Sequence, residues 1–333
     1  MDTVHLYGVR STQYLQENYS DTQGWFLFMS SAADLRTTFL ILFPLLFHFQ
    51  PATGVKLVWV AVLGDWINLV CKWMLFGERP YWWVQETSFY GNSTIPQIKQ
   101  FPMTCETSPA VILQYKDKEI TNTLLWTVFW VIQVCVCLSR VFIGAHFPHQ
   151  VIVGVVVGVA VAEGLNRAPW IHLVSFRGYT HLTLFLLASA LGLYVLLNAV
   201  AVDLLWSLAK AQRWCIKAAW VRLETTPFAS LLRNTGVLFG LGTALHLPMW
   251  DKAVRERVGC GGKSGAPFRL ACASAAILLL HVLDTFGPPV HNYPLFYLLS
   301  FCKSATVPLT TVGIVPYCVA RATNAVTWRG FCL

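Results

Sequence analysis

Long apolar stretches separated by short polar segments are the dominant pattern of this chain. Eight stretches are candidates for membrane-spanning helices, and they cover residues 25–49, 55–76, 124–143, 151–162, 182–201, 231–247, 270–282 and 295–320. A helix of about 20 apolar residues crosses the hydrocarbon core of a bilayer. The pattern predicts an all-α, multi-pass transmembrane helix bundle of about eight spans, forming a single integral membrane domain over residues 1–333.

Two of these stretches contain glycines spaced four residues apart. Gly154 and Gly158 lie in the fourth stretch, and Gly236 and Gly240 lie in the sixth. Small residues at this spacing let two helix backbones approach closely in lipid. We therefore expect close helix contacts at both pairs.

The composition agrees with a membrane protein. Hydrophobic residues make up 56% of the chain and charged residues only 12%, whereas a soluble domain has about 25% charged residues. This excludes a disordered chain, a nucleic-acid-binding module and an ordinary cytosolic enzyme, and it makes the lipid bilayer the expected surroundings. The net charge of +8 is spread over the loops, so no nucleic-acid partner is expected.

The cysteines predict no disulfide framework. The chain has ten cysteines and no CxxC pair. Six of them lie in apolar stretches, where cysteine usually behaves as a small hydrophobic residue. Only Cys105, Cys215 and Cys260 lie in segments that read as loops.

A polar loop, residues 77–123, separates the second and third stretches and contains the sequon Asn92-Ser93-Thr94. Glycosylation at Asn92 would place this loop in the lumen. A second sequon begins at Asn18 and would place the N-terminus there too, which is consistent with two intervening spans.

The first group of candidate functional residues lies at the end of the second stretch. Asp65, Asn68 and Lys72 are spaced to share one helical face, and Arg79 continues that face before Pro80. Lys72 and Arg79 would then form a cradle for an anion. The alternative is that both side chains extend to the membrane interface and fix the topology.

The second group lies at the end of the third stretch and comprises Ser139, Arg140 and His146. The guanidinium of Arg140 suits bidentate contact with phosphate oxygens. His146 fits two roles, a hydrogen-bonded histidine at the membrane interface or a nucleophile.

Taken together, the two groups resemble two signature segments of the type-2 phosphatidic acid phosphatase and vanadium haloperoxidase superfamily, Lys-x6-Arg-Pro and Ser-Arg-x5-His. The surrounding sequence resembles the glucose-6-phosphatase catalytic subunit family, including its liver and islet types. The similar segments are 72–83 (KWMLFGERPYWW), 101–107, 146–150 (HFPHQ), 203–206, 225–229 and 299–304.

The resemblance implies hydrolysis of glucose 6-phosphate in the lumen of the endoplasmic reticulum by a multi-pass membrane protein, for gluconeogenesis, glycogen breakdown and glucose homeostasis. It implies His146 as the nucleophile that forms a phosphohistidine, with Lys72, Arg79 and Arg140 binding the phosphate oxygens. No metal or cofactor is implied, and functional coupling to a separate glucose-6-phosphate transporter is expected. The usual aspartate after the nucleophile is Gln150 here, so another acceptor must orient His146.

The chain departs from the family at its third signature, Pro-Ser-Gly-His, which is absent between Thr107 and Leu124. In the family this histidine is the general acid, and a general acid contributes about 10²- to 10⁴-fold in rate. The family pattern of nine spans also loses one. If the spans on either side insert normally, Arg79 and His146 would face opposite sides of the membrane.

Two hypotheses follow for the chain. In the first, it is a luminal glucose-6-phosphatase whose activity is impaired by loss of the general-acid segment, through splicing or an incomplete sequence. In the second, it is a non-catalytic membrane isoform that retains only anion binding through Lys72 and Arg79. An unrelated transporter or channel is a third and weaker alternative.

Overall fold

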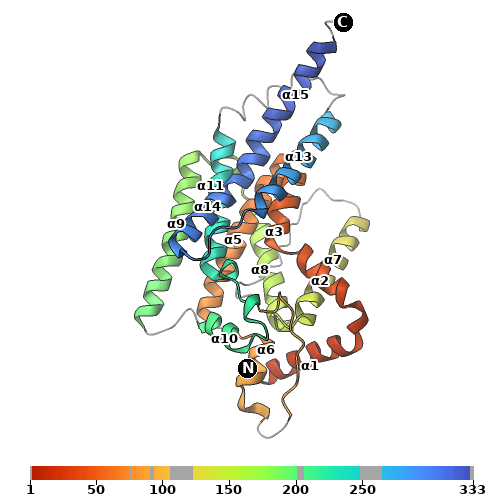
Figure 1. Cartoon of the computed structure of the whole chain (residues 1–333), viewed down its shortest axis with the longest axis vertical. Coiled ribbons are helices and arrows are strands. Elements are labelled where there is room, and N and C mark those ends of the chain that lie inside the picture. The colour runs from red at the N-terminus through yellow and green to blue at the C-terminus, as the bar shows by residue number, and fades with distance from the viewer. Residues whose placement is uncertain are drawn as a thin grey trace. The chain divides into compact units, whose positions relative to one another are not determined.

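The structure is a computed structural model that describes residues 2–75, 77–90, 94–105, 123–200, 206–247 and 265–330. The described parts contain helices and no strand (Figure 1), which confirms the all-α class. The α-helices are α1 (Asp2–Asn18), α2 (Gln23–Ala32), α3 (Leu35–Thr37), α4 (Phe43–Phe49), α5 (Pro51–Leu75), α6 (Pro80–Glu86), α7 (Thr123–Phe142), α8 (Pro148–Asn166), α9 (Phe176–Ala199), α10 (Trp206–Trp214), α11 (Pro227–His246), α13 (Gly265–Thr285), α14 (Tyr293–Pro308) and α15 (Val315–Gly330).

Each predicted apolar stretch falls on one or more of these helices. Five described helical segments are long and apolar enough to cross a membrane, and they are Pro51–Met74, Pro148–Asn166, Phe176–Ala199, Gly265–Thr285 and Tyr293–Ala322. The pair Ser20–Ala32 and Leu35–Phe49 raises this to six if it counts as one broken span. These helices bear out a multi-pass membrane protein, and the number eight stays a prediction.

The chain divides into two compact units. The first comprises Met1–Leu35, Leu63–Asn166 and Ala190–Ser230, and the second comprises Arg36–Val62, Arg167–Ser189 and Leu231–Leu333. All four residues predicted to act on phosphate belong to the first unit. The prediction that the chain forms a single domain stays a prediction.

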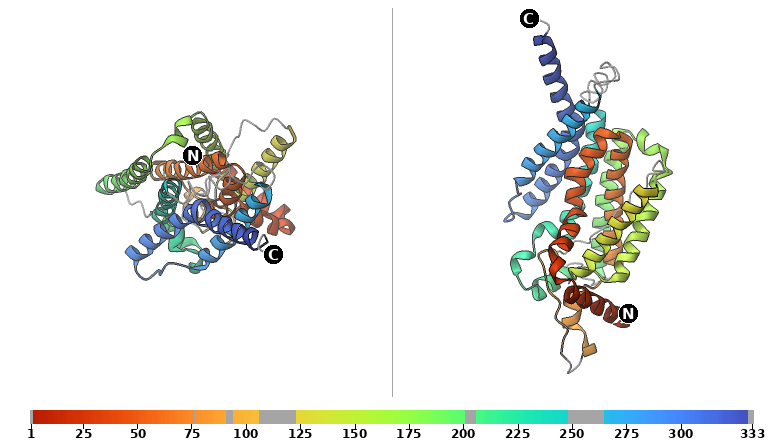
Figure 2. Two further views of the ribbon diagram at one scale, coloured as in Figure 1. Left: turned by 90° about the horizontal axis from the view of Figure 1, so that it is seen from above. Right: turned by 90° about the vertical axis from the view of Figure 1, so that its right-hand side faces the viewer.

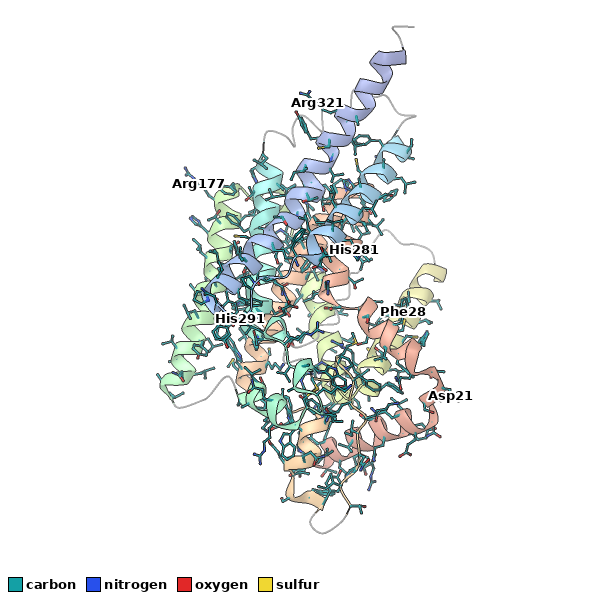
Figure 3. All side chains as sticks on the ribbon, viewed as in Figure 1. Asp21, Phe28, Arg177, His281, His291 and Arg321 are labelled. Atoms are coloured by element: carbon teal, nitrogen blue, oxygen red, sulfur yellow. A yellow bond between two sulfur atoms is a disulfide. The ribbon has the colours of Figure 1, made fainter. Side chains whose placement is uncertain are left out.

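Within the first unit, α2 packs along α7, and α1 lies across the ends of α7 and α8 and against α6 (Figures 1 and 2). The chain turns from α1 into α2 at a short 3₁₀ segment that contains Asp21, labelled in Figure 3. Stacked rings of Phe26 and Phe142, with centroids 4.2 Å apart, lie between α2 and α7. This packing fixes the C-terminal end of α7, where the second group of candidate residues lies.

Within the second unit, α13 packs against α4 and α15. Asp284, near the end of α13, pairs with Arg36 and also with the ammonium of Lys303 at 3.1 Å. A carboxylate between two cations joins α3, α13 and α14 at one point.

Close helix contact was expected at both glycine pairs, and the structure shows it for Gly236 and Gly240 but not at Gly154. A side chain at Gly236 or Gly240 of α11 would collide with the backbone of α14, so the two helices do approach closely there. At Gly154 an added carbon would meet no described atom within 4 Å. The spacing is therefore used for helix contact in α11 but not at Gly154 in α8.

Candidate functional site

The turn after α7 brings His146 back over Arg140. The helix ends at Phe142, and Gly144 adopts a left-handed conformation with φ of 68°. The backbone N–H groups of Ala145 and His146 then both donate to the carbonyl oxygen of Arg140, at 3.2 and 3.4 Å. A glycine in this conformation is a common way to end a helix. The five-residue spacing between Arg140 and His146 thus corresponds to one specific helix-terminating turn.

Arg79 reaches the site by a different route from the one predicted. Helix α5 ends at Leu75, and Arg79 is the extended residue before Pro80, which opens α6. The prediction that Arg79 continues the helical face of Lys72 is therefore wrong, because a residue before proline is pushed out of the helical region. Pro80 is well placed at the start of α6, where its missing N–H is not needed.

The side chain of Arg79 is held inside the protein. It is only 2% exposed, and its Nη1 donates to the carbonyl oxygen of Thr104 at 3.2 Å. Its guanidinium carbon also lies 5.8 Å from the centre of the Trp82 ring. An arginine that anchors a helix at the membrane interface would instead keep its charge in water. The burial therefore favours the anion cradle over the topology anchor.

The charges of three cations act on the His146 ring. Burial, followed by the charges of Arg79, Arg140 and Lys72, holds the pKa of His146 well below its ordinary value, and a hydrogen bond with Gln150 opposes this only in part. As a whole residue His146 is half-buried, and its Nε2 atom is buried and has no hydrogen-bond partner among the described residues. At neutral pH His146 is a neutral imidazole with an available nitrogen, close to three fixed positive charges.

The expectation that the two halves of the site face opposite sides of the membrane is wrong. Lys72, Arg79 and Arg140 act together on His146, and a hydrogen bond from Gln150 joins the two chain segments at Glu78. The expectation assumed that successive apolar stretches must alternate in direction. Helices α5 and α7 both end close to this hydrogen bond, at Leu75 and Phe142, so the two stretches do not alternate in direction here.

Two hydroxyl-bearing residues to which the sequence analysis assigned no role support the cradle. Nη1 of Arg140 donates to Oγ of Ser30 on α2 at 2.7 Å. Oγ1 of Thr104 donates to the carbonyl oxygen of Ile143 at 2.5 Å, while the Thr104 carbonyl receives Arg79. Thr104 therefore connects Arg79 to the turn that carries His146. Thr104 lies in the family-like segment 101–107, but the resemblance assigned it no role, and only the folded contacts identify Ser30.

The sequence predicted no disulfide framework, but one disulfide joins Cys105 to Cys215, with 6.0 Å between their Cα atoms. The two residues are 110 positions apart, and only the fold brings them together. Their placement in loops was the available signal, because cysteines outside the apolar stretches are not needed as hydrophobic residues. Disulfides persist in oxidising compartments such as the lumen of the endoplasmic reticulum.

A partly buried ion cluster connects α6 to α10. The ammonium of Lys210 lies 2.7 Å from the carboxylate of Glu78 and 2.8 Å from that of Glu86. Nε1 of Trp82 donates to Glu78, and Nε1 of Trp214 donates to Glu86 at 2.7 Å. Burial lowers the pKa of Lys210, but the two carboxylates raise it by more, so the net shift is upward. Glu78 is thereby paired with Lys210. Its negative charge therefore does not neutralise the positive charge of the neighbouring Arg79.

Of the other residues singled out in the sequence, Asn68 has a buried Nδ2 atom with no hydrogen-bond partner among the described residues. Oγ of Ser139 donates within its own helix to Val136 at 2.7 Å. Asp65 accepts a hydrogen bond from Ser230 at 2.9 Å. Asn92 lies outside the described residues, so its glycosylation stays a prediction. Among the residues that the structure describes, no group of three or more His, Cys, Asp or Glu side chains is placed to hold a metal ion.

Comparison with known proteins identifies the family. The PAP2 superfamily matches residues 53–172, which include Lys72, Arg79, Arg140 and His146. The chain is 47% identical to "Glucose-6-phosphatase catalytic subunit 1" of Felis catus and 48% identical to that of Rattus norvegicus, over 96% of each chain. It is 44% identical to "Glucose-6-phosphatase 2" of Homo sapiens, over 96% of this chain and 97% of the relative. The chain belongs to the glucose-6-phosphatase family.

The proteins of this family are phosphoric monoester hydrolases, and the cluster around His146 is the part of this chain suited to that chemistry. The alignments with the cat and rat relatives run over 349 and 347 positions, more than the 333 residues of this chain. The relatives therefore contain residues that this glucose-6-phosphatase family member lacks. No solved structure matches the chain.

Proposed function

We propose that this chain hydrolyses glucose 6-phosphate to glucose and phosphate through a phosphohistidine at His146, and that loss of the general-acid segment impairs this reaction. The observation that carries the proposal is that His146 is brought beside Arg140 by the turn after α7 and beside the Arg79 segment by the Gln150–Glu78 hydrogen bond, where the charges of Lys72, Arg79 and Arg140 all act on it. Three cations match the charge on the non-bridging oxygens of a phosphate monoester as it is transferred.

The first chemical step transfers the phosphoryl group to the histidine. The lone pair of Nε2 forms a bond to phosphorus while the bond from phosphorus to the sugar oxygen breaks. The sugar oxygen leaves with the bonding electrons and has to take up a proton. In the second step water attacks phosphorus, the N–P bond breaks, and the imidazole recovers its lone pair. The attacking water loses one proton, which balances the proton taken up by the sugar oxygen. Low pKa values keep a histidine available for such attack at neutral pH.

The absent Pro-Ser-Gly-His segment affects only one part of this sequence of steps. A sugar alkoxide is a poor leaving group, so a general acid normally protonates it as the bond breaks, with a contribution of about 10²- to 10⁴-fold. A phenolate with an electron-withdrawing group leaves without a proton. The chain should therefore hydrolyse p-nitrophenyl phosphate far better than glucose 6-phosphate.

The test measures both activities in microsomes that express three proteins: this chain, its His146→Ala variant, and a version with the missing segment restored. We expect this chain to hydrolyse p-nitrophenyl phosphate, the restored version to hydrolyse both substrates, and His146→Ala to hydrolyse neither. Equal glucose 6-phosphate activity in this chain and the restored version would refute the impairment. Absence of p-nitrophenyl phosphate hydrolysis would refute the nucleophilic role of His146.

The same geometry also supports the second candidate, a membrane isoform that binds anions without turning them over. The cations remain in place around His146 whether or not an acid is present. This candidate predicts that the chain binds inorganic phosphate but does not hydrolyse p-nitrophenyl phosphate. The assay above, with phosphate binding measured on the same samples, separates the two.

We further propose that the site faces the lumen of the endoplasmic reticulum, where the reaction would serve gluconeogenesis, glycogen breakdown and glucose homeostasis. The Cys105–Cys215 disulfide supports an oxidising compartment on this side. A luminal site needs a separate transporter to deliver glucose 6-phosphate across the membrane. Glycosidase treatment of the expressed chain should increase its mobility on a gel, and Asn92→Gln should abolish that change.

A further inference from the structure

The side chain of Gln150 joins the two segments that carry the site. Its Oε1 accepts a hydrogen bond from the backbone N–H of Phe147 at 3.1 Å, and its Nε2 donates to the backbone carbonyl oxygen of Glu78 at 2.8 Å. Phe147 directly follows His146, and Glu78 directly precedes Arg79. One amide therefore links the backbone beside the nucleophile to the backbone beside a phosphate-binding cation.

The chemistry of these two partners requires an amide at this position. A backbone N–H can only donate and a backbone carbonyl can only accept, so the orientation of the Gln150 amide is fixed by its partners. A carboxylate offers only acceptors and would place an oxygen against the Glu78 carbonyl. The fit is also close, because a side-chain carbon added at Gly77 would lie 3.4 Å from Nε2 of Gln150.

The connection matters because the two segments come from distant parts of the chain. Gln150 and Glu78 are separated by 72 positions. Arg79 is extended and not held within a helix, so its backbone depends on contacts of this kind. Displacement of a reacting group by about 1 Å can cost 10²-fold in rate.

We propose that Gln150 is a positioning residue that holds Arg79 at the correct distance from His146 for both to contact one phosphate. The proposal rests on the proposed function of His146. Besides its hydrogen bond with the His146 side chain, Gln150 acts in this role through its two backbone hydrogen bonds, and it carries no charge. It neither relays a proton nor contacts the substrate.

The test compares Gln150→Glu with a matched control, Gln100→Glu. Gln100 makes the same kind of bridge, since its Nε2 donates to the carbonyl of Trp214 at 3.0 Å and its Oε1 accepts from the N–H of Ile216 at 3.0 Å. That bridge flanks Cys215 rather than His146 or a cation of the cradle, and Gln100→Glu leaves the Cys105–Cys215 disulfide itself in place. The full chain is purified in detergent, and its affinity for inorganic phosphate and its p-nitrophenyl phosphate activity are measured per folded protein.

We expect Gln150→Glu to weaken phosphate affinity and kcat/KM by about 10- to 100-fold, and Gln100→Glu to leave both close to the starting protein. A role in folding alone would change the folded fraction of both variants without this difference. Equal values for the two variants, after correction for folded protein, would overturn the proposal.

A pH series supplies a readout that a loss of packing would not produce. When the carboxyl group introduced by Gln150→Glu is protonated, it regains an O–H that can donate to the Glu78 carbonyl, as the amide does. The ratio of phosphate affinity between variant and starting protein should therefore approach one as the pH falls toward about 4.3, the ordinary glutamate value. A ratio that stays constant with pH would overturn the proposed hydrogen bond.

These outcomes also separate the two proposals. If the starting protein binds phosphate but hydrolyses no p-nitrophenyl phosphate, the nucleophilic function fails, while the binding comparison still tests Gln150. If the starting protein hydrolyses p-nitrophenyl phosphate and Gln150→Glu does so equally well, the positioning role fails alone. If the starting protein does neither, both are overturned.

Discussion

Removal of the Cys105–Cys215 disulfide should destabilise the protein. The bond links residues 110 positions apart, and chain-entropy arithmetic for a loop of that length gives roughly 5 kcal/mol at 25 °C. Disulfides usually deliver less than the full entropic value, typically about 2–4 kcal/mol. We therefore expect Cys215→Ser to lower the free energy of unfolding by about 2–4 kcal/mol, which corresponds to roughly 3–6 °C in melting temperature for a chain of 333 residues.

The assay is thermal unfolding of the full chain in detergent, with and without a reductant. The reductant should lower the melting temperature of the starting protein and leave that of Cys215→Ser unchanged. Cys302→Ser is the control, because Cys302 is a free, exposed cysteine. If Cys215→Ser melts at the same temperature as Cys302→Ser, or if the reductant lowers both variants equally, the disulfide contributes nothing and the reasoning fails.

The disulfide should also affect phosphate binding, because Cys105 directly follows Thr104, whose carbonyl receives Nη1 of Arg79. Freed from Cys215, this segment holds Arg79 less firmly. Inorganic phosphate should therefore raise the melting temperature of Cys215→Ser by less than it raises that of Cys302→Ser, since ligand stabilisation follows affinity. An equal rise in the two variants would show that Arg79 does not depend on the bond.

Three further predictions concern other parts of the fold. Gly144→Ala should cost about 1–2 kcal/mol for its left-handed backbone, with added strain because the new carbon would lie 3.0 Å from Ile98, and a denaturant titration that shows no loss would contradict it. Lys210→Met should cost about 1 kcal/mol. The pKa of Lys210 is raised above 10.5 and that of Glu86 is lowered below 4.5 despite burial, so the pair stabilises the fold between these values. The melting-temperature difference between variant and starting protein should therefore shrink below pH 4.5 and above pH 10.5. Gly240→Leu should separate α11 from α14 and reduce the yield of folded protein in a size-exclusion assay, whereas Gly154→Leu should not.

The apolar pattern was sufficient to predict the fold class, because membrane-spanning helices depend mainly on length and hydrophobicity. Local spacing was also sufficient for Arg140 and His146, since one turn after α7 joins them. It was misleading for Arg79. The helix that carries Lys72 ends at Leu75, before Arg79 is reached. The side chain of Arg79 is instead placed by its hydrogen bond to the carbonyl oxygen of Thr104.

The features that sequence reasoning missed depend on pairs of residues far apart in the chain. Cys105 and Cys215 read as two unrelated loop residues, and Ser30 reads as an ordinary residue of an apolar stretch until Arg140 is placed beside it. The mistaken separation of Arg79 from His146 has the same origin. That prediction counted membrane crossings between Arg79 and His146 along the chain. The position of each segment is set instead by contacts between distant segments, such as the hydrogen bond from Gln150 to Glu78.

The three cations that lower the pKa of His146 make its protonation depend on what occupies the site. A bound phosphate dianion would cancel much of their field, so the ring would take up a proton more readily when the site is filled than when it is empty. By thermodynamic reciprocity, proton uptake and anion binding would then strengthen one another. Released phosphate would accordingly be retained more tightly in acid than in base. The protonation state of His146 would then depend on whether phosphate is bound.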